Sequence, residues 1–194
     1  MGSGSRTRKF PADEQGANRR WIDSGGLHRF FADIAAAVPR IEELAFVCIG
    51  TDCSTGDSFG PWIGTLLRER GVPHVIGTLH SPCDADRYEE AIASIPDTLT
   101  IVAIDASLGH RDRCGLYLID EGPLYPARAT GRRLPPIGHY SVAGVVGPLN
   151  VKPYWSLQRA SIYKVVGMAR AVADAACAAW GIPVTDSVTL RLGE

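Results

Sequence analysis

The sequence lacks three features that would each define a class of protein. It has no apolar run near the ~20 residues that a membrane-spanning helix needs. Residues 1–16 carry basic side chains without the apolar segment of a secretory signal. The formal net charge is −1, which gives no reason to expect the clustered positive charge of a nucleic-acid-binding protein. We therefore expect neither a membrane nor a nucleic acid as a partner.

Cysteine patterns typical of disulfide frameworks and zinc sites are also missing. The five cysteines are an odd number, and no two of them have CxxC spacing. Free thiols of this kind are typical of a reducing compartment, which fits a cytoplasmic protein. Cys53 alone lies in the Gly-rich loop after the first predicted strand. We favour a small turn residue there over a nucleophile.

The length of the chain bounds the number of domains. A chain of 194 residues, 45% of them hydrophobic, is long enough for one sizeable core, and a second full domain is not expected. Residues 1–20 are interpreted as a flexible tail and residues 21–194 as a single α/β domain.

Strand and helix patterns alternate along this domain. Continuous apolar runs predict buried strands at Leu44–Ile49 and Leu99–Ile104. The alternation as a whole predicts a three-layer α/β sandwich with a mostly parallel sheet. The other predicted elements are helices at Ser24–Val38, Ser58–Arg70, Asp84–Ile95 and Trp155–Trp180, a strand at His74–Leu79, an antiparallel edge strand at Gly115–Asp120, an edge strand at Val184–Leu192, a strand or helix start at Tyr140–Val146, and a long loop at Glu121–Gly138.

The stretch Leu44–Arg70 predicts a strand, a Gly-rich turn and a helix in succession. Ligands of open α/β sheets bind beyond the carboxyl ends of such strands, so chemistry is expected between Gly50 and Asp57. The loop has neither the GK[ST] ending of a P-loop nor a GxGxxG pattern, which disfavours nucleotide binding. An anion at the helix N-terminus stays open. The candidate binding residues are Gly50, Thr51, Asp52, Ser54, Thr55, Gly56, Ser58 and, from the later loop, His139.

Two aspartates follow predicted buried strands of one sheet. Asp57 and Asp105 are expected to act as a catalytic pair, in which one carboxylate activates water while the other stays protonated. With His139 they would alternatively hold a divalent metal that keeps an open position. Each residue also has a structural interpretation: Asp57 as a helix cap, Asp105 as an acceptor of loop hydrogen bonds, and His139 as a surface residue.

Three blocks of the sequence resemble a known family. They are IGTDCSTGDSFGP, VAIDASLG and GPLYPARATGRRLPPIGHYSVAGVV, and the resemblance to the YyaC-type family of sporulation proteins extends over residues 44–180. That family in turn resembles the spore germination protease and, more remotely, the hydrogenase maturation proteases. The resemblance implies an α/β fold with helices on both faces of a mostly parallel sheet. It also implies a role in the cytoplasm of the spore or mother cell of a spore-forming bacterium.

The resemblance further implies roles for single residues. Asp57 resembles the first acidic residue of the germination protease, and Asp105 resembles the second. The maturation proteases hold nickel with a Glu, an Asp and a His. Asp105 resembles that Asp and His139 stands near that His, but the Glu has no match, because Ser58 follows Asp57.

We therefore expect a sporulation or germination protein with an aspartate-dependent, peptidase-like site. Its substrate would be a protein or peptide. One alternative is a non-catalytic regulatory module of the same fold that binds a peptide or small ligand. The other is a metal-dependent peptidase, and no cofactor is assigned beyond its divalent metal.

Overall fold

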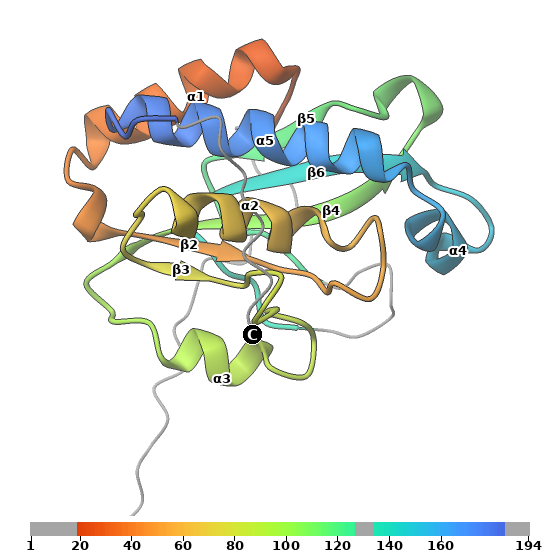
Figure 1. Cartoon of the computed structure of the whole chain (residues 1–194), viewed down its shortest axis with the longest axis horizontal. Helices are drawn as coiled ribbons and strands as arrows, with labels where there is room; N and C mark the ends of the chain where they lie inside the picture. The colour runs from red at the N-terminus through yellow and green to blue at the C-terminus, as the bar shows by residue number, and fades with distance from the viewer. Residues whose placement is uncertain (1–18, 127–133, 185–194) are drawn as a thin grey trace, which may run out of the picture.

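The computed structural model describes residues 19–126 and 134–184. The strands are β1 (Arg20–Ile22), β2 (Leu44–Cys48), β3 (Val75–Ile76), β4 (Thr100–Gly109), β5 (Tyr117–Asp120) and β6 (Tyr140–Pro148). The helices are α1 (Ser24–Ala37), α2 (Phe59–Glu69), α3 (Tyr88–Ala93), α4 (Pro153–Gln158) and α5 (Ile162–Ala179), with 3-10 turns η1 (Ile41–Glu43) and η2 (Arg111–Arg113) (Figure 1). Within these described residues, no helix is both long and apolar enough to cross a membrane.

Two predictions fall mainly on residues that are not described. Residues 1–18 of the expected tail lie outside the described part of the chain, and Arg20, also assigned to the tail, begins β1 instead. The predicted strand Val184–Leu192 lies outside it as well, except for its first residue.

The six described strands form one mixed sheet in the order β1-β5-β6-β4-β2-β3. The β2–β3, β2–β4 and β4–β6 pairs are parallel, whereas β5 is antiparallel to both β6 and β1. The prediction of a mostly parallel sheet is therefore wrong. The unpredicted strand β1 adds a second antiparallel pair to the sheet. The antiparallel orientation of β5 is itself predicted and confirmed, and it follows from the connection between β4 and β5, residues 110–116, which is too short for the crossover that parallel strands need. The chain reverses there, and β1 takes the edge position predicted for β5.

The two strands predicted from continuous apolar runs are confirmed. All five residues of β2 are buried, and β2 pairs in parallel with β4, with Cys48 opposite Ile104. However, β4 does not end before Asp105 but continues to Gly109. These further residues pair with β6, and Asp105 lies opposite Ala143. Asp105 is therefore held inside the sheet rather than on a loop.

Other predicted elements differ in length or kind. Tyr140–Val146, which the sequence left open between strand and helix, lies within strand β6. The predicted helix Trp155–Trp180 is two helices, α4 and α5. The first of them, α4, ends at Gln158. In its last turn the carbonyl of Leu157 accepts a hydrogen bond from the N–H of Gly56 at 2.9 Å. β3 and α3 are shorter than predicted.

Helices α1, α2 and α5 lie over one face of the sheet, and α3 lies on the opposite face (Figure 1). The side chains of β4 alternate between the two faces. Val102 and Ile104 join the apolar cluster under α1, α2 and α5, whereas Ile101 and Ala103 join the smaller cluster on the α3 side. Asp105 continues the second row, so its carboxyl group lies on the α3 side, just beyond the point where the neighbouring strand β2 ends opposite Ile104.

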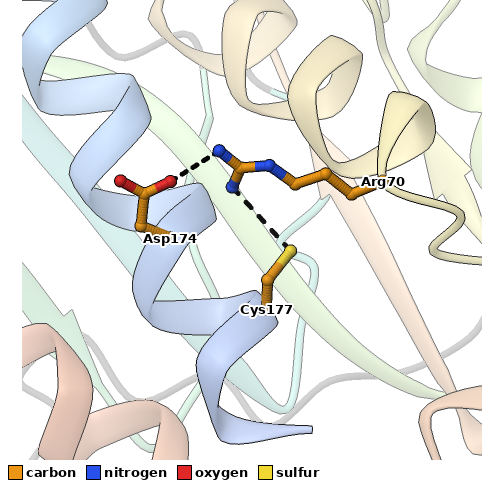
Figure 2. A network of polar contacts seen from close by, with 3 residues as sticks. All are labelled: Arg70, Asp174 and Cys177. Carbon is orange, nitrogen blue, oxygen red and sulfur yellow. Dashed lines mark hydrogen bonds and ion pairs between the residues drawn. The ribbon is translucent and has the colours of Figure 1, made fainter. Parts of the chain in front are cut away.

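A buried arginine fastens α2 to α5. The side chain of Arg70 is 9% exposed, and its Nη2 lies 2.6 Å from Oδ1 of Asp174 (Figure 2). Its Nη1 donates to the sulfur of Cys177 at 3.8 Å. Gly71 follows with φ +84°, which is the left-handed C-cap predicted from the sequence. The contact holds the end of α2 that is remote from the Gly-rich loop.

Candidate functional site

A cavity of about 610 Å³ opens near the carboxyl ends of β2 and β4. Its polar lining includes Asp57, Asp105, Ser107, Asp84 and Asp86. The apolar part of its wall consists mainly of Ile49, Leu108, Leu124, Leu134, Leu149 and Leu157. Small-molecule and cofactor sites have volumes of about 300–1,000 Å³ and similar mixed walls. The cavity is therefore the candidate functional site.

The loop after β2 folds back so that Asp57 reaches this cavity. Gly50 has φ +142°, and a Cβ atom on it would lie 2.0 Å from the carbonyl oxygen of Asp57. The same carbonyl oxygen accepts a hydrogen bond from the N–H of Thr51 at 3.3 Å. Only glycine permits both this backbone conformation and this close approach. Gly50 therefore positions Asp57 although it has no side chain to offer a ligand.

Part of the backbone of the loop is already hydrogen-bonded within the protein. Four of its N–H groups already donate to carbonyl oxygens at 2.9–3.3 Å, those of Gly50, Thr51, Gly56 and Ser58. The N-cap residue of α2 is Ser58, whose hydroxyl donates to the carbonyl of Thr55 at 2.7 Å and makes no capping hydrogen bond. Ser58, rather than Asp57, therefore stands at the N-cap of α2, and these four amides are not free to hold an anion.

Asp57 and Asp105 line the cavity from different elements, and both are partly exposed. Burial raises the pKa of the Asp105 carboxyl to about 8. A hydrogen bond from the N–H of Ala106 at 2.7 Å lowers this pKa, and the negative charge of Asp57 raises it further. Burial also raises the pKa of Asp57, and the nearby Ser54 hydroxyl offsets part of that rise. The pair therefore keeps a proton near neutral pH, mainly on Asp105.

The other loop candidates contribute less to the cavity. Gly50 and Thr51 line it, as expected. Ser54 is only 4% exposed, and its hydroxyl oxygen lies near Asp57 without meeting the geometry of a hydrogen bond. The candidates that do not belong to the lining are Asp52, Ser54, Thr55, Gly56 and Ser58.

His139 lies at the opposite end of the parallel strands. Its N–H donates to the carbonyl of Ile101 at 2.8 Å, and its Nδ1 accepts the N–H of the same residue at 2.9 Å. Ile101 precedes Asp105 by four residues on β4, which separates the two positions by about 13 Å along the strand. The structure therefore brings Asp57 and Asp105 to one cavity but does not bring His139 there.

A metal held by these three residues does not fit this placement. Among the described residues, no group of three or more His, Cys, Asp or Glu side chains is arranged to hold a metal ion. Ser58, which follows Asp57, supplies no carboxylate in place of the maturation-protease Glu. We therefore derive no chemical step through a metal.

The polar residues of the lining that were not among the candidates include Ser107, Asp84 and Asp86. Ser107 is two residues after Asp105 on the same strand, so strand alternation indicates it once β4 is known to continue. Asp84 belongs to a predicted helix start, and its Oδ1 accepts the N–H groups of Asp86 and Arg87, both at 3.1 Å. In the sequence Asp84 is explained fully as a helix cap, so nothing indicated that it also lines the cavity.

Comparisons with known proteins point to one family. Residues 23–175, which include both aspartates of the cavity, match a family described as "Protein of unknown function (DUF1256)". A relative from Bacillus subtilis (strain 168), described as "Uncharacterized protein YyaC", is 33% identical over 153 residues. That alignment covers 76% of this chain and 72% of the relative. The comparison with solved structures gives no match.

Proposed function

We propose that this chain, which belongs to the DUF1256 family together with YyaC-type proteins, is a hydrolase that cleaves a peptide bond with Asp57 and Asp105. One observation carries the proposal. Two carboxyl groups from separate elements line one cavity, and the pKa of Asp105 is raised to about 8. Pairs of carboxyl groups whose environments give them different pKa values are typical of acid–base catalysis.

The two aspartates divide the proton transfers according to their protonation states. Asp57, as carboxylate, takes a proton from a water molecule, whose oxygen attacks the carbonyl carbon of the substrate. Asp105, which is protonated near neutral pH because its pKa is about 8, donates its proton to the carbonyl oxygen. When the tetrahedral intermediate collapses, Asp105 takes this proton back, and Asp57 passes its own to the leaving amine.

The occupied loop amides support this role for Asp105. The N–H groups of Gly50 and Thr51, two backbone donors on the cavity wall, already donate to carbonyl oxygens. They do not form an oxyanion hole in this arrangement. The negative charge that develops on the substrate oxygen is therefore neutralised by the proton of Asp105.

The biological setting belongs to the same proposal and rests on the resemblance of TGDSFGP and AIDAS to the germination protease. We place the protein in sporulation or germination, in the cytoplasm of the spore or mother cell, with a protein or peptide as substrate. The three-layer sandwich and the kinship with the germination and maturation proteases are part of this proposal too. Helices on both faces of the sheet support them (Figure 1).

The apolar wall of the cavity favours one alternative function. Leu124, Leu134 and Leu149 would hold apolar side chains of a peptide whether or not a bond is cleaved. A module that binds a peptide without hydrolysing it would use the same cavity. Such a module would not need the two aspartates to differ in protonation.

Cleavage of a peptide mixture separates these functions. A digest of spore proteins is incubated with the wild type, Asp57→Asn, Asp105→Asn and the matched control Asp33→Asn, which changes an exposed carboxylate on α1. The products are read by mass spectrometry, with and without EDTA. The wild type and the control should cleave in both conditions, and each cavity variant should lose activity about 100-fold or more.

The other outcomes identify the alternatives. Cleavage that survives Asp105→Asn would remove that residue from the mechanism. Peptide binding without cleavage by the wild type would favour the binding module. Cleavage that is lost with EDTA, and also in His139→Asn, would favour the metal-dependent peptidase.

A further inference from the structure

Exposed apolar side chains gather at one end of the molecule. Six of the eight large exposed apolar residues in the described part of the chain lie within residues 149–163: Leu149, Val151, Tyr154, Trp155, Ile162 and Tyr163. They belong to the loop after β6, to α4 and to the first turn of α5, which follow one another at this end (Figure 1). We call these six residues the apolar cluster.

The exposed area of the apolar cluster is close to that of a protein interface. A Tyr or Trp side chain presents about 150–250 Å², so Tyr154, Trp155 and Tyr163, exposed by 59%, 57% and 87%, leave roughly 400 Å² uncovered. The three aliphatic residues, which include the fully exposed Val151, extend this area toward the ~800 Å² that each partner contributes to a standard interface. Monomers rarely expose an apolar patch of this size without a function for it.

A shallow groove on α5 adjoins the apolar cluster. Its lining includes Ile162, Tyr163, Val166 and Gly167. Gly167 is an exposed residue within α5, and a Cβ atom on it would meet no atom within 4 Å. Glycine destabilises a helix interior relative to alanine. No atom in the described part of the chain comes close enough to require a glycine here, and the missing side chain leaves the groove open at Gly167.

We propose that this face forms a homodimer, in which the groove at Gly167 of each copy receives an aromatic side chain of the apolar cluster of the other copy. A two-fold interface uses the same patch on both subunits and must therefore be self-complementary. The apolar cluster supplies exposed aromatic side chains, and the groove, which shares Ile162 and Tyr163 with it, supplies the open space that would receive them. Tyr and Trp are also enriched in the cores of protein interfaces.

The position of the apolar cluster favours a second copy over a peptide substrate. Of its members only Leu149 lines the cavity, whereas Ile162 and Tyr163 line the separate groove on α5. A substrate held in the cavity would not cover the α5 part. A second copy on this face would lie beside the cavity mouth, and the proposal does not depend on peptide cleavage.

The mass of the full chain in solution tests the proposal. Sedimentation velocity over a wide range of concentration should give a species of twice the chain mass of 20.8 kDa. A Cβ atom on Gly167 meets no atom of its own chain within 4 Å, so Gly167→Leu should fill the groove and give a monomer with an unchanged circular dichroism spectrum. Trp155→Ser should raise the dimer Kd about tenfold or more.

The matched control is Ala36→Leu, which adds the same side chain to an exposed position of α1 and should leave the dimer intact. A wild type that stays monomeric at all concentrations would overturn the proposal. So would a dimer that persists in both Gly167→Leu and Trp155→Ser, because another face would then hold the subunits together.

Discussion

Replacing Asp105 with Asn should stabilise the protein at alkaline pH. Burial raises the pKa of this carboxyl from 3.8 to about 8 in the folded state. Between these values the unfolded chain loses the proton while the folded chain keeps it, so the folded state binds more protons and its stability falls as the pH rises. Asn has no such proton to lose, and its Oδ1 can still accept the N–H of Ala106.

The size of the effect follows from the two pKa values. A rise from 3.8 to about 8 corresponds to about 6 kcal/mol, at 1.36 kcal/mol for each pKa unit. This is an upper limit, because Asp105 is partly exposed to the cavity and its titration is coupled to that of Asp57. We expect the variant to gain about 2–3 kcal/mol over the wild type between acidic and alkaline pH.

Urea unfolding at pH 5, 7 and 9 measures this difference in the free energy of unfolding. The gain of Asp105→Asn should grow across the series and level off above the folded-state pKa of about 8. Asp33→Asn, at an exposed position of α1, is the matched control and should show no such trend. If Asp105→Asn instead destabilises the protein equally at all three pH values, Asp105 is a structural hydrogen-bond acceptor and the argument is refuted.

Three further predictions concern the site and the helix layer. The rate of cleavage should follow a bell-shaped pH profile. It should rise above pH 3.8 as Asp57 ionises and fall near pH 8 as Asp105 loses its proton. A rate that stays constant through pH 8 would exclude Asp105 as the acid. Gly50→Ala should lower the free energy of unfolding by about 3 kcal/mol in urea titrations, because its Cβ would lie 2.0 Å from the carbonyl oxygen of Asp57; a change near zero would contradict the close approach. Asp174→Ala should lower the Tm more than Arg70→Met, because it leaves the guanidinium of Arg70, which is only 9% exposed, without its partner. In Arg70→Met the remaining carboxylate of Asp174 is 43% exposed and stays hydrated; equal losses of Tm would argue against this ion pair.

Local sequence patterns predict the central strands β2 and β4 better than the edge strand β1. β2 and β4 are continuous apolar runs because both faces of the sheet are covered there, and such runs are visible in the sequence. β1 has no such pattern: it consists of three residues, of which none is fully buried. It is held by pairing with β5, with Trp21 opposite Leu118, and by the ion pair between Arg19 and Asp120 at 2.9 Å. Contacts between residues so distant in the sequence leave no local signal.

The same contrast applies to the site. Asp57 and Asp105 could be predicted to share one cavity because each follows an apolar run of the parallel part of the sheet. The place of His139 depends instead on the direction of β6, which the sequence left open. Since β6 runs parallel to β4, the residue before it lies at the amino ends of the strands, away from the aspartates.

The central claim, that Asp57 and Asp105 hydrolyse a peptide bond, is tested most directly by incorporation of oxygen from water. In water enriched in oxygen-18 and without added metal, the wild type should release peptides that carry the label in each new C-terminal carboxylate. Asp57→Asn and Asp105→Asn should release labelled peptides about 100-fold more slowly, or not at all. Undiminished labelling by Asp105→Asn, or no labelling by a wild type that binds the same peptides, would contradict the claim.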